Sequence, residues 1–128
     1  MTRNIIWAAA HEPTEQQLKE LKEMGKVYYL KDIEKALHYT ICNIRFNTRI
    51  NVLVEVLLDA CSLNTNTSLV QPAGSPAFQF ALGRAVSLRV KPPQILYAYS
   101  ERVSNDVPQP NGSIIKTSVF NHKGWIEC

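Results

Sequence analysis

The sequence predicts an α/β protein: a mostly parallel, Rossmann-like sheet flanked by helices, with a C-terminal β-hairpin. Short apolar segments alternate along the chain with amphipathic helical segments, which is typical of parallel sheets. The turn pair Asn111-Gly112 then joins two extended segments near the C-terminus, as in a hairpin. A length of 128 residues fits one domain, so residues 1–128 are expected to fold as a single unit.

The first part of the chain predicts strand, helix and strand. Asn4 to Ala10 is short and almost wholly apolar, as in a central strand buried on both faces. Thr14-Glu-Gln-Gln17 has the spacing of a capping box. The helix that it opens is expected to reach Met24 and to end at Gly25 in a left-handed conformation. Val27 to Leu30 is predicted as the second strand.

The next part is read as helical. A short helix is expected over Asp32 to His38, followed by a mixed segment from Tyr39 to Phe46. A strongly amphipathic helix is predicted from a cap at Asn47 to near Ser62. Cys61 falls on its apolar face and is interpreted as a small buried hydrophobic residue.

The stretch from Thr67 to Gly83 is the best candidate for a ligand site. Leu69-Val70 predicts a buried strand, Gly74 a tight turn, Ser75 a helix cap and Pro76 the first helical position. The free N–H groups and the dipole at a helix start favour an anion, which would lie beyond the carboxyl end of the strand. Such junctions also occur in α/β proteins that bind nothing there.

Pro92-Pro93 excludes a helix, and Gln94 to Ser100 predicts the fourth strand. Arg102 to Val107 and Ser113 to Phe120 are expected to form the hairpin. The second of these strands alternates, so one side is available to pack and the other to meet a ligand or a second subunit.

If the sheet is parallel, several polar residues meet at the carboxyl edge of its strands. His11 is a candidate acid, base or phosphate donor, and the alternative is a solvated loop histidine. Arg102 offers a planar fork for phosphate, and the alternative is a surface ion pair with Glu101 or Asp106. The other candidates at this edge are Gln71, Gly74, Ser75 and Ser100.

Lys116 and Ser118 share one face of the last strand, and His122 continues it; the alternative is an ordinary solvated edge. His38 and Tyr39 are interpreted as structural.

The distribution of charge favours an anionic ligand, and the alternative is a chance arrangement of surface residues. The net charge is +3, and the segment between Asp59 and Glu101 contains no acidic residue but three basic ones, Arg84, Arg89 and Lys91. No apolar run is long enough to span a bilayer and no signal region is visible, so we expect a cytoplasmic protein. The three cysteines have no metal-ligand spacing, and we expect neither a metal nor a cofactor.

Four segments resemble the small stand-alone CRISPR-associated ring nucleases of type III systems. The segments are Ala10-His11-x-Pro13-Thr14-x-x-Gln17, Leu69-Val-Gln71-Pro-Ala-Gly-Ser75, Tyr99-Ser-Glu-Arg-Val103, and Gln109-Pro-Asn-Gly-Ser-Ile-Ile-Lys-Thr-Ser-Val-Phe-Asn-His122. They are distributed over nearly the whole chain, and the C-terminal pattern is the most specific part.

The resemblance implies a CARF-related homodimer that binds a cyclic oligoadenylate messenger, most often cyclic tetra-adenylate, and that ends antiviral signalling by cutting the ring without a metal. By position, His11, Arg102 and Ser75 would carry catalysis. The ligand-binding residues would be Gln71, Gly74, Ser75, Ser100, Arg102, Lys116 and His122. Two other hypotheses stay open: a protein that sequesters the same ligand uncut, and a small interaction domain without a nucleotide ligand. DNA and membranes are not expected partners.

Overall fold

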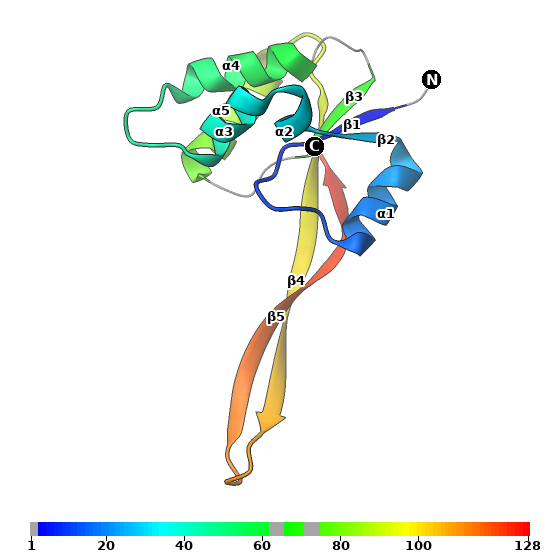
Figure 1. The fold of residues 1–128 in the computed structure, drawn as a ribbon, viewed down its shortest axis with the longest axis vertical. Helices are drawn as coiled ribbons and strands as arrows, with labels where there is room; N and C mark the ends of the chain where they lie inside the picture. Colours follow the sequence, from blue (N-terminus) through cyan, green and yellow to red (C-terminus); the bar gives the residue numbers. More distant parts are fainter. Residues whose placement is uncertain (1–2, 62–65, 71–74) are drawn as a thin grey trace.

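The structure, a computed structural model, describes residues 3–61, 66–70 and 75–128 (Figure 1). Within these residues one sheet has the strand order β2-β1-β3-β4-β5. Its strands are β1 (Asn4–Trp7), β2 (Lys26–Tyr29), β3 (Thr67–Val70), β4 (Gln94–Pro108) and β5 (Ile114–Glu127). The first four are parallel to their neighbours, and β5 runs antiparallel to β4. The predicted fold class is confirmed.

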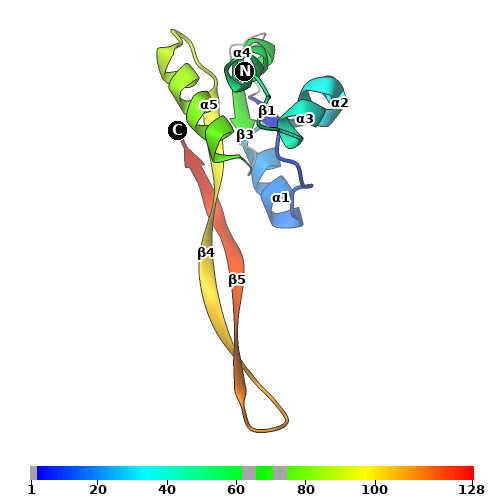
Figure 2. The same cartoon turned by 90° about the vertical axis from the view of Figure 1, so that its left-hand side faces the viewer.

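Helices cover both faces of the sheet (Figure 2). They are α1 (Glu15–Met24), α2 (Leu30–Ile33), α3 (Lys35–Cys42), α4 (Ile50–Cys61) and α5 (Pro76–Leu88). Helix α1 packs on one face, while α3, α4 and α5 pack on the other. Because β1 lies between β2 and β3, the chain moves to opposite sides of β1, as in doubly wound α/β sheets.

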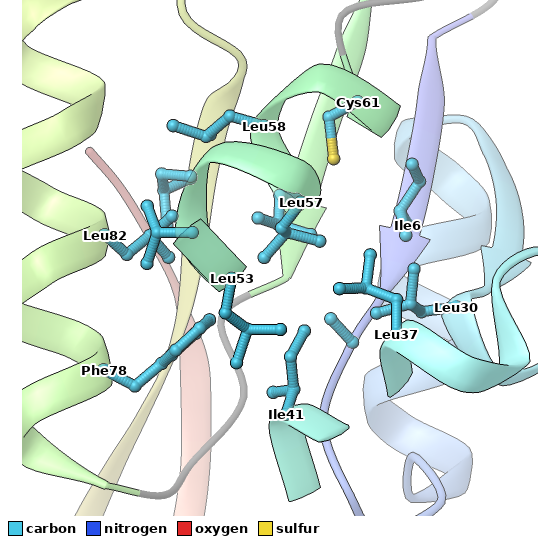
Figure 3. Packing of buried hydrophobic residues seen from close by; sticks show 14 of the residues in the cluster. Ile6, Leu30, Leu37, Ile41, Leu53, Leu57, Leu58, Cys61, Phe78 and Leu82 are labelled. Carbon is cyan, nitrogen blue, oxygen red and sulfur yellow. The ribbon is translucent and has the colours of Figure 1, made fainter. Parts of the chain in front are cut away.

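Alternation along β1 divides the core into two clusters. Ile5 and Trp7 face α1, and Ile6 and Ala8 face the cluster to which α2, α3, α4 and α5 contribute. The second side is the larger, and Figure 3 shows its leucine-rich centre between α4, α5 and the sheet. Cys61 belongs to this centre, and burial raises the pKa of its thiol to about 12, as expected for an inert buried side chain.

The capping box of α1 is present as predicted. Thr14 Oγ1 accepts from the N–H of Gln17 at 3.1 Å, and Gln17 Oε1 accepts from the N–H of Thr14 at 3.0 Å. The left-handed conformation predicted for Gly25 is wrong, because its φ of 174° is extended. Gly25 is required for a different reason: a Cβ there would overlap the carbonyl oxygen of Arg3. That oxygen accepts from the N–H of Lys26 at 2.9 Å, which aligns β2 with the chain entering β1.

Two helix boundaries differ from the predictions. The helix expected over Asp32 to His38 is replaced by α2 and α3, separated at Glu34, whose φ of −142° breaks the helix. Helix α4 begins at Ile50, three residues after the predicted cap Asn47. The reason is a turn in which the N–H of Arg45 donates to Thr48 Oγ1 at 2.8 Å, so the helix starts after that turn.

Strand β4 does not end where the sheet ends. Its pairing with β3 stops at Val70↔Leu96, whereas its pairing with β5 continues to Pro108↔Ile114. The segments predicted as separate strands, Gln94 to Ser100 and Arg102 to Val107, are therefore one strand. The hairpin projects far from the body of the protein, and Gly112 closes its tip at a φ of 86° (Figures 1 and 2).

Candidate functional site

The last paired residues of the parallel strands mark the carboxyl edge of the sheet. Trp7 is paired with Tyr29 on one side and Val70 on the other, and Val70 is paired with Leu96. The hairpin leaves the sheet from this edge (Figure 2). Ligands of open α/β sheets bind beyond this edge, so the groups around the base of the hairpin form the candidate site.

Four rings and one carboxylate meet there, from β1, α1, β5 and the loop after β1. Trp7 contacts His11 and Trp125 edge to face, with ring centroids 5.6 and 6.4 Å apart. His122 contacts Trp125 at 5.2 Å. We call Trp7, His11, Glu20, His122 and Trp125 the hairpin-base cluster. It brings His11 and His122, both predicted site residues, into one continuous set of contacts.

Glu20 holds the cluster together from α1. Its Oε2 accepts from Trp125 Nε1 at 3.0 Å and lies 2.7 Å from His122 Nε2. The hydrogen bond from His122 lowers the pKa of Glu20, so this carboxylate is ionised and can only accept. His122 Nε2 must then carry the proton. Its Nδ1 is buried and has no hydrogen-bond partner among the described residues.

His11 is exposed, but its loop is fixed. The backbone oxygen of His11 accepts from Trp7 Nε1 at 2.8 Å, and His11 Nδ1 lies 3.0 Å from the backbone oxygen of Glu12. Since a carbonyl oxygen only accepts, Nδ1 carries the proton in this contact, and Nε2 of the neutral ring has a free lone pair. The geometry therefore presents His11 Nε2 as a proton acceptor at the carboxyl edge.

A cleft of about 700 Å³ lies beside the same loop, on the side of α2 and α3. Its lining includes two lysines and an aromatic ring, Lys35, Lys31 and Tyr39. Lys31 also makes an ion pair with Glu12, and that hydrogen bond raises the pKa of Lys31. Tyr39 is 68% exposed, so its ring is available for stacking. Asp32 also lines the cleft and Lys31 is paired with Glu12, so Lys35 is the cation available beside the Tyr39 ring for a nucleotide.

The same cleft contains a thiol and an imidazole. Cys42 Sγ lies 3.6 Å from His38 Nε2, one helical turn away on α3. Partial burial raises the pKa of Cys42, so the thiol is protonated at neutral pH. The pair is therefore a weak hydrogen bond rather than an activated nucleophile. His38 and Tyr39, interpreted from the sequence as structural, line this cleft.

The remaining predicted site residues are only partly brought together. Gln71 and Gly74 lie outside the described residues. Ser75 precedes α5, but its side chain makes no cap hydrogen bond, so the predicted capping is wrong; we find no local contact that explains it. The first N–H groups of α5 consequently receive no acceptor from the Ser75 hydroxyl.

Ser100, Arg102 and Lys116 lie on the hairpin and are exposed. Ser100 is directly opposite His122, whereas Arg102 lies about 20 Å beyond Leu96 along β4, at roughly 3.3 Å per residue. Within the described chain Arg102 forms no ion pair with Glu101 or Asp106.

Arg89, predicted as part of a positive surface near α5, makes ion pairs with Glu55 and Asp59 at 2.7 and 2.8 Å. These carboxylates from α4 offset its charge, so Arg89 contributes less to an anion site than its place in the sequence indicates. In the described ranges no group of three His, Cys, Asp or Glu side chains could hold a metal ion. None of the described helices is long and apolar enough to cross a membrane.

Glu20 and Trp125 are site residues that the sequence did not indicate. The partner of Glu20, His122, lies 102 positions away. No local pattern encodes such a contact. The indole of Trp125 offered the better signal, because a tryptophan N–H that is shielded from water needs an acceptor.

These features define the chain as an α/β protein with a doubly wound sheet, a polar carboxyl edge and a projecting hairpin. The chain belongs to the Uncharacterized protein MJ1673 family, whose model matches residues 3–126. Comparisons with curated proteins and with solved structures find no match.

Proposed function

We propose that this protein is a ring nuclease that binds cyclic oligoadenylate, by resemblance cyclic tetra-adenylate, and cleaves it without a metal, which would switch off type III CRISPR antiviral signalling. The single observation that carries the proposal is the meeting of three separate segments of the ring nuclease resemblance at one place. Ser100 is the cross-strand partner of His122, and two tryptophans connect His122 to His11.

Chemical features of the hairpin and of the cleft beside the His11 loop also favour this ligand. Arg102 shares a hairpin face with Ser100 and lies opposite Phe120, which is 73% exposed. A guanidinium beside an exposed aromatic ring can pair with a phosphate while the ring stacks on a base. The cleft with Lys35 and Tyr39 offers the same combination on the other side of the His11 loop.

The proposed reaction transfers a phosphoryl group of the ring from a 5′-oxygen to the neighbouring 2′-oxygen. A ribose 2′-hydroxyl loses its proton to His11 Nε2 and attacks the adjacent phosphorus, and the bond from phosphorus to the 5′-oxygen breaks. The leaving 5′-oxygen takes a proton from water and His11 returns its proton to the solvent, so the products are a 2′,3′-cyclic phosphate end and a 5′-hydroxyl end. By the resemblance, Ser75 and the Arg102 guanidinium, which reaches in from the hairpin, would stabilise the charge that develops on the phosphate oxygens.

The first experiment incubates the protein, in EDTA and in excess over ligand, with labelled cyclic tri-, tetra- and hexa-adenylate. Linear products with 2′,3′-cyclic phosphate ends from one ring size would support the enzyme. Tight binding with an intact ring would support the second hypothesis, a sequestering protein. Neither binding nor cleavage would contradict both.

Two variants test the assigned roles. His11→Ala should slow single-turnover cleavage by about 10²-fold or more and leave ligand binding near that of the wild type. Arg102→Ala should weaken binding itself, with Arg102→Lys recovering part of the affinity because the charge remains without the fork. Our role for His11 is wrong if its variant loses binding while the bound fraction is cleaved at the normal rate.

A further inference from the structure

The cleft beside the His11 loop has an ordered row of side chains along one side. Lys35, Tyr39 and Asn43 follow one another at intervals of four residues on α3 and its C-cap, and all three line the cleft. Residues four apart lie on the same face of a helix, about 6 Å apart along its axis at roughly 1.5 Å per residue. The row therefore presents a cation, an aromatic ring and a carboxamide in that order.

The carboxamide at the end of the row has a fixed orientation. Asn43 Nδ2 donates to the backbone oxygen of Tyr39 at 2.7 Å. A carbonyl oxygen only accepts, so this contact assigns the amide nitrogen to the side of the helix. The end of the amide that has no partner in the described chain is Oδ1, and this atom can only accept.

The rest of the lining fits the sugar and phosphate of a nucleotide. Lys35 forms no ion pair within the described ranges, so its charge is available to a phosphate. Asp32 opposes a bare anion, but its carboxylate can accept from ribose hydroxyls, as an acidic residue does in dinucleotide-binding α/β sheets. The volume of about 700 Å³ is also that of a small-molecule site.

We propose that this cleft is a nucleotide subsite that selects adenine through Asn43 Oδ1. The base stacks on Tyr39, which is 68% exposed, and its 6-amino group donates to Oδ1. Guanine and hypoxanthine carry an acceptor, O6, at that position, and two acceptors repel each other. The phosphate lies toward Lys35, at the other end of the row. That the nucleotide is one adenylate of a ring rests on the proposed function, whereas the selection of the base does not.

Cys42 reports occupancy from inside the cleft. Its thiol is exposed and lines the cleft, whereas Cys61 is buried and the exposed Cys128 lies outside the lining. A nucleotide bound in the cleft should therefore slow alkylation of Cys42 and leave alkylation of Cys128 unchanged. Partial burial raises the pKa of Cys42, so the reaction is followed at mildly alkaline pH, where more thiolate is present.

The test titrates the full chain with 5′-AMP or with 5′-IMP, which carries an oxygen in place of the 6-amino group. The alkylation rate of each cysteine is measured by peptide mass spectrometry. In wild type, AMP should protect Cys42 at about tenfold lower concentration than IMP, the effect of one hydrogen bond. Asn43→Ala should abolish this preference. Asn47→Ala, the control, changes an exposed asparagine outside the cleft and should keep it.

Tyr39→Leu tests the stacking separately, and it should weaken protection by both nucleotides alike because every base has a π-face. Near-UV circular dichroism, which reports the packing of Trp7 and Trp125, checks that the variants remain folded.

Equal protection by AMP and IMP in wild type, or a preference that Asn43→Ala retains, would overturn the role of Asn43. No protection of Cys42 by either nucleotide, or equal protection of Cys42 and Cys128, would overturn the subsite. These outcomes are separate from those of the ring assay. Ring cleavage without protection of Cys42 by AMP contradicts only this inference, and protection by AMP without binding of any ring contradicts only the proposed function.

Discussion

Glu20 connects α1 to the base of the hairpin, and removing its carboxylate should destabilise the fold. In Glu20→Ala, the N–H groups of His122 and Trp125 lose their common acceptor. The His122 side chain is 8% exposed, so water cannot easily replace that acceptor. Leaving such donors unpaired costs about 1 to 3 kcal/mol. A loss of about 2 kcal/mol would lower Tm by roughly 6 to 10 °C in a chain of this size.

Urea unfolding followed by tryptophan fluorescence measures this loss, since both tryptophans lie in the hairpin-base cluster. Glu23→Ala is the matched control: Glu23 is exposed on the same helix, and the same residue types are exchanged. The control should change the free energy of unfolding by no more than about 0.5 kcal/mol. If Glu20→Ala is as stable as Glu23→Ala, the contact between α1 and the hairpin base does not stabilise the protein.

The same pair of proteins predicts a pH dependence. The pKa of Glu20 is lowered in the folded state, chiefly by the hydrogen bond from His122, from an ordinary value of 4.5. A depressed pKa contributes stability above the unfolded value and loses it as pH falls through the folded value. The difference between wild type and Glu20→Ala should therefore be full at neutral pH and shrink below about pH 4.5. A difference that grows as pH falls would contradict this assignment.

Two further substitutions test the local geometry by urea unfolding. Gly25→Ala should cost about 1 to 3 kcal/mol of unfolding free energy, because the new Cβ would overlap the Arg3 carbonyl oxygen. Gly83→Ala is the control and should be neutral or stabilising, because there is open space around Gly83 in its helix. Equal stability of the two variants would refute the close approach at Gly25. Thr14→Ala should cost about 1 kcal/mol by removing the cap of α1, and no loss would mean that water replaces the hydroxyl.

The body of the fold follows from local sequence patterns. Ile5 to Trp7 forms the buried part of a central strand because these side chains are apolar on both faces. The capping box at Thr14 starts α1 within its own first turn, and Asn111-Gly112 closes the hairpin because glycine tolerates the positive φ. Each of these depends on residues within a few positions of one another, which is why the sequence predicts them.

The hairpin and the site at its base depend on contacts between distant segments. The sequence predicts that β4 ends near Ser100, but β5 pairs with its backbone as far as Pro108 and carries the strand beyond the sheet. The same pairing places Ser100 opposite His122 and Arg102 well outside the edge at which it was expected. Position 25 likewise requires glycine because of a distant residue: a Cβ there would overlap the Arg3 carbonyl oxygen.

The sequence by itself determined the class of the fold, the order of its elements and the polar residues available at the carboxyl edge, since these depend on periodicity and turn chemistry. Only the tertiary structure decided which of those residues meet. Glu20 and His122 come together across 102 positions because α1 packs on the same face of the sheet as Trp125 of β5. No periodicity within either segment contains that information.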